Sequence, residues 1–357
     1  MAIENTGEIA KPLRIVGNRW RVPSGRRVAP VPGVPARSAT LGNLGSLIRQ
    51  PIPLALVALA GYSGLLHRDS LRGIDRELVI LRTTWNVGGY FPYAAHVPVT
   101  RLLRGGRDAQ QAIQRGPEDA AWRPREAALL RVVDDLRHTL GITPETRAEA
   151  ERHLSERQLM EIAAISTLYE TVAMTFGSVG FRMPGAVGRF VRGEPIPEVG
   201  AQWPPGLRRP RAARVRTASW APEDASVTQA LRRHPRLAKA LRLFARHAPR
   251  FGVLDPVDRD FAVAAVAQLM DSRPLPQESI PRLAALGSLV YELHEECFAT
   301  DETWTAAAEY LTDRELIDVC VLVGGLRMHY LVARAAAPAD RAPARGLDDA
   351  AAQARIS

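Results

Sequence analysis

The chain has 357 residues and a mass of 39.1 kDa, which favours two domains over one. Hydrophobic residues make up 46% and charged residues 24%, so a disordered chain, a collagen-like repeat and a disulfide scaffold are excluded. The two cysteines, Cys297 and Cys320, are too few for a disulfide framework or a thiolate zinc site, and they favour a reducing, cytoplasmic setting.

Neither a membrane segment nor a nucleic-acid surface is expected. The N-terminus carries Glu4 and Glu8 and no apolar run, unlike a signal peptide. The longest apolar run, 52–66, is shorter than the roughly 20 residues that cross a bilayer. The net charge of +9 comes mostly from arginine, and the densest basic run, 208–216, lacks the aromatic residues that stack on bases. The sequence therefore predicts a soluble protein that binds neither membranes nor nucleic acid.

Two stretches rich in proline and arginine divide the chain. Residues 1–38 are predicted to form an extended arm and residues 182–219 a linker. Between and after them the apolar pattern is helical, and strand alternation is missing. We therefore expect an all-α protein with a first domain over 39–181, a second over 220–337 and a C-terminal tail over 338–357.

Two helix starts are recognisable in the first domain. Thr143 followed by Pro144 is typical of an N-cap and the first helical position. Ser155 is a second N-cap, with Gln158 three residues later in the position that completes a capping box.

The two predicted domains are related in sequence. Residues 127–136 (AALLRVVDDL) match residues 284–293 (AALGSLVYEL), and this offset of 157 continues without a gap to Leu159 and Leu316. Such a long period indicates duplication of a whole helical domain.

Upstream, the offset between the copies is different. Asp75-Arg76-Glu77 matches Asp258-Arg259-Asp260 at an offset of 183, so the second copy lacks a segment of 26 residues. In the first copy this segment contains residues 85–96 (WNVGGYFPYAAH), which the second copy replaces with a predicted turn over 272–276. A candidate active site is therefore expected in the first copy.

The residues DRELVILR (75–82) followed by YAAHVP (93–98) resemble the carboxymuconolactone decarboxylase and alkylhydroperoxidase-like family. Residues 154–159 and YETVAM (169–174) resemble its closing helices. The resemblance implies two tandem alkylhydroperoxidase-like helical bundles, the second degenerate, without a metal or an organic cofactor. It also implies a homo-oligomer, in which a trimer of two-copy chains would mimic a hexamer.

The chain departs from both catalytic branches of that family. Glu77 and His96 stand 19 residues apart, as in the peroxidase branch, but the positions of its two cysteines hold Gly89 and Pro92. Without a thiolate, peroxide reduction by this route is excluded. The decarboxylase branch keeps the histidine but has acidic residues where Tyr90 and Pro92 stand, so this chain retains the histidine of an acid/base pocket and lacks the carboxylates of that branch.

His96 and Glu77 are the main catalytic candidates. Imidazole titrates near neutral pH, so His96 is suited to act as a general base or acid, with helix capping or packing as the structural alternative. Glu77 either orients His96 or only forms a salt bridge near a helix start.

Four aromatic residues complete the candidate site. Tyr90 and Tyr93 either stabilise an enolate-like oxyanion or pack in the core. Trp85 and Tyr169 are expected in the pocket wall or the core.

Two functions from different classes follow. The first is a cofactor-independent lyase or isomerase that performs decarboxylation, dehydration, isomerisation or cyclisation. Its substrate would be a small organic acid, a lactone or a specialised metabolite. The second is a non-catalytic scaffold or a ligand-binding protein of the same fold.

Overall fold

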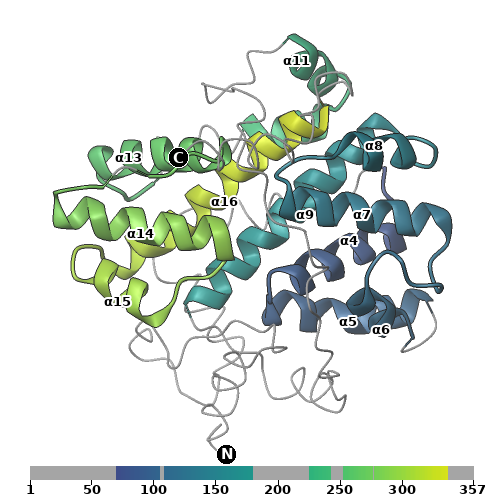
Figure 1. Cartoon of the computed structure of the whole chain (residues 1–357), viewed down its shortest axis with the longest axis horizontal. Coiled ribbons are helices and arrows are strands. Elements are labelled where there is room, and N and C mark those ends of the chain that lie inside the picture. Colours follow the sequence, from purple (N-terminus) through teal and green to yellow (C-terminus); the bar gives the residue numbers. More distant parts are fainter. Residues whose placement is uncertain (1–69, 105–107, 180–224, 243–251, 276, 337–357) are drawn as a thin grey trace, which may run out of the picture.

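The computed structural model describes residues 70–104, 108–179, 225–242, 252–275 and 277–336 (Figure 1). These residues form helices and contain no strand, which confirms the predicted all-α class. The helices are α4 (Gly73–Asn86), α5 (Tyr90–Arg104), α6 (Asp108–Arg115), α7 (Pro124–His138), α8 (Pro144–Ala150), α9 (Glu156–Ser178), α11 (Ala225–Arg232), α13 (Pro256–Met270), α14 (Pro281–Glu296), α15 (Asp301–Ala308) and α16 (Asp313–Ala336). Outside the described residues lie the expected arm, linker and tail, the apolar run 52–66 and the basic run 208–216.

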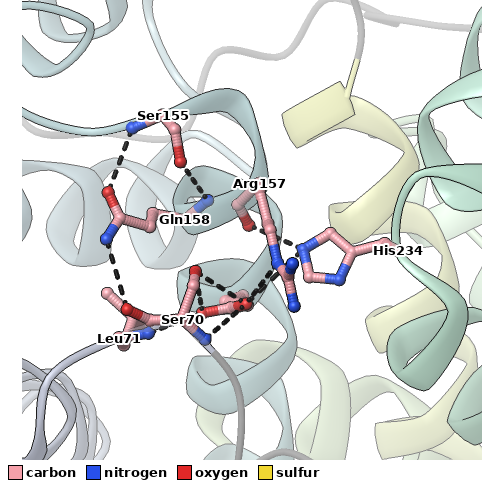
Figure 2. Close-up of polar contacts among 7 residues, drawn as sticks. Ser70, Leu71, Ser155, Arg157, Gln158 and His234 are labelled. Carbon is pink, nitrogen blue, oxygen red and sulfur yellow. Dashed lines mark hydrogen bonds and ion pairs between the residues drawn. The ribbon is translucent and has the colours of Figure 1, made fainter.

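Both predicted helix starts are confirmed. The Thr143 hydroxyl accepts a hydrogen bond from the backbone N–H of Thr146 at the start of α8. Ser155 and Gln158 form the reciprocal capping box at the start of α9 (Figure 2). Each cap satisfies backbone donors that the first helical turn leaves without a partner.

The two longest helices, α9 and α16, lie between the other helices (Figure 1). One side of this pair is covered by α4 to α8 and the other by α13 to α15. The backbones approach closely because Gly324 has no side chain, since a Cβ atom there would lie 2.0 Å from the Thr171 hydroxyl. Both helices are long and apolar enough to cross a membrane, but most of that apolar surface is buried inside the protein. Their composition is thus accounted for by their central position in the core.

Four helices recur along the chain at the offsets seen in the sequence. The helix α13 begins 183 residues after α4, while α14, α15 and α16 begin 157 residues after α7, α8 and α9. Helices α5 and α6 have no counterpart, because no helix occurs among the described residues between α13 and α14.

Polar contacts recur at the same offsets. The Asp135 carboxylate accepts hydrogen bonds from the backbone N–H and the hydroxyl of Thr143, at 2.9 and 2.7 Å. At the matching positions, Glu292 accepts the same two bonds from Thr300, at 2.7 and 3.0 Å. Two more pairs of contacts correspond in this way. Arg125 donates to Asp75 in the first half, as Arg282 donates to Asp258 in the second. The backbone N–H groups of residues 70 and 71 donate to Glu161, as those of residues 253 and 254 donate to Asp318.

A buried ion pair joins α9 to α16. Arg327 donates to the Glu170 carboxylate at 2.8 Å, and both side chains are almost completely shielded from water. The partners are 157 residues apart, so they occupy corresponding positions on the two central helices. Burial by itself would lower the pKa of Arg327, but the charge of Glu170 raises it above its ordinary value, and the guanidinium stays charged.

A second polar cluster connects the segment 225–242 to the N-terminal end of α9 (Figure 2). The buried Glu161 carboxylate accepts bonds from the Ser70 hydroxyl and from the N–H groups of Ser70 and Leu71, at 2.9 to 3.0 Å. The Nε2 atom of His234 lies 3.1 Å from the carbonyl oxygen of Arg157 and 3.5 Å from Glu161. A carbonyl only accepts, so Nε2 carries the proton. Burial lowers the pKa of His234, with only partial opposition from this bond.

Candidate functional site

The turn between α4 and α5 places the candidate site against α9. Gly88 adopts a φ of 65°, a left-handed conformation that glycine tolerates better than other residues. The N–H of Gly89 then bonds to the carbonyl of Thr84 at 2.8 Å. A Cβ atom on Gly89 would lie 2.6 Å from the Cβ of Ala173, so the two glycines let the start of α5 press against α9.

Pro92 lies in the first turn of α5 and does not interrupt it. Its missing N–H falls among the first donors of a helix, which have no partner inside the helix. The N–H of Tyr93 still bonds to the carbonyl of Gly89 at 3.1 Å. Tyr93 and His96 therefore stand on one continuous helix.

His96 connects a carboxylate to a phenol. Its Nδ1 atom lies 2.7 Å from Oε2 of Glu77 on α4. Its Nε2 atom lies 3.0 Å from the hydroxyl of Tyr169 on α9, and the two rings meet edge-on with centroids 5.0 Å apart. Three helices thus contribute one residue each to a continuous hydrogen-bonded chain.

The donors in this chain follow from elementary chemistry. An ionised carboxylate can only accept, so Nδ1 of His96 carries a proton and donates it to Glu77. In neutral imidazole the other nitrogen, Nε2, is then an acceptor. With His96 neutral, the Tyr169 hydroxyl donates to Nε2, and the two bonds together hold the ring in one orientation.

The surroundings keep Tyr169 protonated. Burial raises the pKa of the phenol strongly, the nearby charge of Glu77 raises it further, and Arg76 opposes the shift. The Tyr169 residue is 6% exposed, and the side chains of Glu77 and His96 are 9% and 18% exposed. These three side chains are therefore largely shielded from water, which strengthens the electrostatic interactions among them.

The remaining predicted aromatic residues lie elsewhere. Tyr93 is fully buried, with its ring centroid 5.9 Å from that of buried Trp85, and its hydroxyl accepts a 3.5 Å bond from Gln114. These are contacts of the core. Tyr90 opens α5, but its side chain lies outside the described part of the chain.

A network that the sequence did not predict holds α4 in place. Arg82 donates two bonds of 2.7 Å to Asp134 on α7 and one of 2.7 Å to the carbonyl of Ile113 on α6. Asn86 donates a further 2.7 Å bond to Asp134. These partners are 31 to 52 residues apart, so no local pattern could have identified them.

The second half has no matching arrangement among its described residues. The counterpart of Glu77 is Asp260, whose side chain is 71% exposed, and the counterpart of Tyr169 is Leu326. Within the described residues, no group of three or more His, Cys, Asp or Glu side chains is placed to hold a metal ion.

Comparisons with protein-family models, curated proteins and solved structures found no match for this chain. The fold and the site themselves define an all-helical protein in which a carboxylate, an imidazole and a phenol are hydrogen-bonded in a row and shielded from water. Three side chains in this arrangement can store a proton, pass it along and hold the imidazole in one tautomer.

Proposed function

We propose that this protein is a cofactor-independent enzyme that moves a proton on a small organic substrate. The observation that carries this proposal is the hydrogen-bonded chain of Glu77, His96 and Tyr169. A histidine oriented by a carboxylate is an arrangement that serves general acid–base catalysis.

In the proposed reaction, the proton removed from the substrate is stored on His96. The imidazolium that forms lies 2.7 Å from the Glu77 carboxylate, which stabilises its charge. Because the surroundings are shielded from water, this stabilisation is larger than it would be at the surface. Glu77 thus orients His96 in the resting state and stabilises its charged form during the reaction.

The proposed reaction class is that of a lyase or an isomerase. Decarboxylation, dehydration, isomerisation and cyclisation of a small organic acid, lactone or specialised metabolite can each proceed through a proton transfer that His96 would accept or deliver. Peroxide reduction stays excluded from the proposal, since Gly89 and Pro92 stand where the thiols would be needed.

The proposal includes the architecture implied by the resemblance. The first half would be a carboxymuconolactone decarboxylase-like bundle and the second a degenerate copy, in a soluble cytoplasmic homo-oligomer. The recurring helices and polar contacts support a duplication. Light scattering on the full chain is expected to give a trimer, and a strict monomer would remove the oligomer from the proposal.

One observation favours a second candidate function, a non-catalytic scaffold or ligand-binding protein. Both ring nitrogens of His96 already have partners inside the protein. In that case the three residues would only tie α4, α5 and α9 together, and their loss would lower stability without affecting any reaction.

The test is metabolite profiling of the source organism with the gene deleted and then restored in variant form. We expect a precursor to accumulate and to be cleared by the wild type. His96→Ala and Glu77→Gln should clear it about 10² to 10⁴ times more slowly. Asp260→Asn, at the corresponding exposed position of the second half, is the matched control and should act like the wild type. Clearance by His96→Ala at the wild-type rate would favour the scaffold.

A further inference from the structure

The closed geometry around His96 restricts how a substrate proton can reach it. Nδ1 is bonded to Glu77 and Nε2 to Tyr169, so neither nitrogen is open to a substrate. Either one of these bonds breaks during the reaction, or one of the two partners passes the proton on.

The bond to Glu77 is the less suitable one to break. It is the shorter of the two, 2.7 Å against 3.0 Å, and it involves a charged carboxylate. Charge-assisted hydrogen bonds are roughly twice as strong as neutral ones. The proton is therefore exchanged with the substrate on the side of the His96 ring that faces Tyr169.

Tyr169 is also held too firmly to serve as a removable cap. It is 6% exposed and stands on α9, where the next residue, Glu170, forms the buried ion pair with Arg327. Its ring contacts the His96 ring edge-on. Displacing the phenol would break both the ring contact and the hydrogen bond with His96, whereas a proton can cross the phenol without any such movement.

We infer that Tyr169 is the catalytic residue that exchanges a proton with the substrate, and that His96 acts behind it as the proton store. This inference rests on the proposed function. The substrate C–H or O–H bond breaks and its proton bonds to the Tyr169 oxygen, while the phenol's own proton moves to Nε2 of His96. The bonding pair stays on the substrate as an enolate-like anion. Phenol, imidazolium and carboxylate result, and the reverse transfer delivers the proton to the product.

The two proton movements must be coupled. The raised pKa of Tyr169 makes a free phenolate unfavourable, so the phenol gives up its proton only as it receives another. In the imidazolium state Nε2 becomes a donor to the Tyr169 oxygen, and the phenolic O–H can then turn toward the substrate. The hydroxyl of Tyr93, a buried tyrosine on the same helix as His96, accepts a bond from Gln114 instead.

The experiment restores the deleted gene with Tyr169→Phe, Tyr93→Phe or His96→Ala. Tyr291→Phe, at an exposed tyrosine of α14, is the control. We expect Tyr169→Phe to slow precursor clearance as much as His96→Ala does, while the control acts like the wild type. Normal clearance by Tyr169→Phe with loss in His96→Ala would overturn the role of Tyr169 and leave the proposed function intact. Loss in Tyr93→Phe alone would move the role to Tyr93, and normal clearance by His96→Ala would overturn both proposals.

A second variant separates proton transfer from packing. Fluorotyrosine incorporated at position 169 keeps the shape of the side chain but makes the phenol more acidic. Using the purified full chain and the accumulated precursor, we expect the rate of turnover at a fixed pH to change with the acidity of the phenol, because the phenolic O–H bond breaks as its proton moves to His96. An unchanged rate would show that the hydroxyl only positions His96 and would overturn the inference. Circular dichroism confirms that each variant is folded.

Discussion

The two halves of the described chain use four corresponding helices in the same order, but only the first half contains a chain of polar groups suited to proton transfer. The difference lies in α5 and α6, which have no counterpart among the described residues between α13 and α14. His96 stands on α5, and Glu77 on α4 is covered by it. One additional helix thus both supplies the imidazole and shields the carboxylate that orients it.

The helix faces have adapted to this difference. Leu81 and Trp85 on α4 are buried, whereas their counterparts on α13, Ala264 and Gln268, are respectively exposed and half-buried. A face that loses its covering helix is more stable in water with small or polar side chains, because exposed apolar area is unfavourable. The second half therefore has the residues of a protein surface at these positions.

The largest effect on stability is expected from the ion pair that joins the halves. Glu170→Ala or Arg327→Ala leaves an uncompensated buried charge and should lower the free energy of unfolding by about 3 to 5 kcal/mol. Replacing both residues with methionine should restore at least the wild-type stability, because two buried charges disappear together. Urea unfolding of the full chain measures all three variants.

The exposed pair of Arg131 and Glu118 is the matched control for that experiment. The two side chains form an ion pair at 2.9 Å near the surface. Arg131→Ala should change the free energy of unfolding by less than about 1 kcal/mol. A double methionine variant less stable than either single variant would show that the pair is more than an interaction between opposite charges.

A smaller effect should distinguish the two helix faces. Leu81→Ala removes a fully buried side chain of α4, the helix that packs against α5 and α6, and should lower the free energy of unfolding by about 2 to 5 kcal/mol. The reverse change at the corresponding position, Ala264→Leu, should stay within about 0.5 kcal/mol, because that position is exposed. Thermal unfolding measures the loss of stability in both variants, and equal losses would contradict the difference in burial between the two positions.

The smallest effect is expected in the pH dependence of stability that arises from His234, which contacts the N-terminal end of α9. Because the pKa of His234 lies below its ordinary value of 6.5, the unfolded chain binds a proton more readily than the folded one. Its contribution to stability is complete above pH 6.5 and is lost as the pH falls toward the pKa in the folded state. The slope reaches at most about 1.4 kcal/mol per pH unit.

His234→Gln retains a side-chain donor for the carbonyl of Arg157 but does not titrate. Unfolding free energies measured between pH 7 and pH 5 should therefore decrease more steeply for the wild type than for this variant. Both proteins contain the other buried histidines, so their difference isolates His234. Parallel curves would exclude a contribution from its protonation.

The sequence by itself was sufficient for the features that depend on near neighbours. The caps at Thr143 and Ser155 were predictable because each side chain bonds to a backbone group three residues away. The all-α class follows from the spacing of apolar residues within each helix. The repeat was visible because matching residues keep a constant offset along the sequence, as Asp135 and Thr143 do with Glu292 and Thr300.

Only the tertiary structure decided which of the candidate side chains meet. Tyr169 is 73 residues from His96, and Tyr93, only three residues from His96, has its described contacts in the core. Spacing along one helix states which residues share a face, but the neighbouring helix determines what that face contacts. The crossing of α4, α5 and α9, fixed by the close approach of Gly89 to Ala173, joins the carboxylate, the imidazole and the phenol. Such contacts depend on packing between distant segments, which no local pattern encodes.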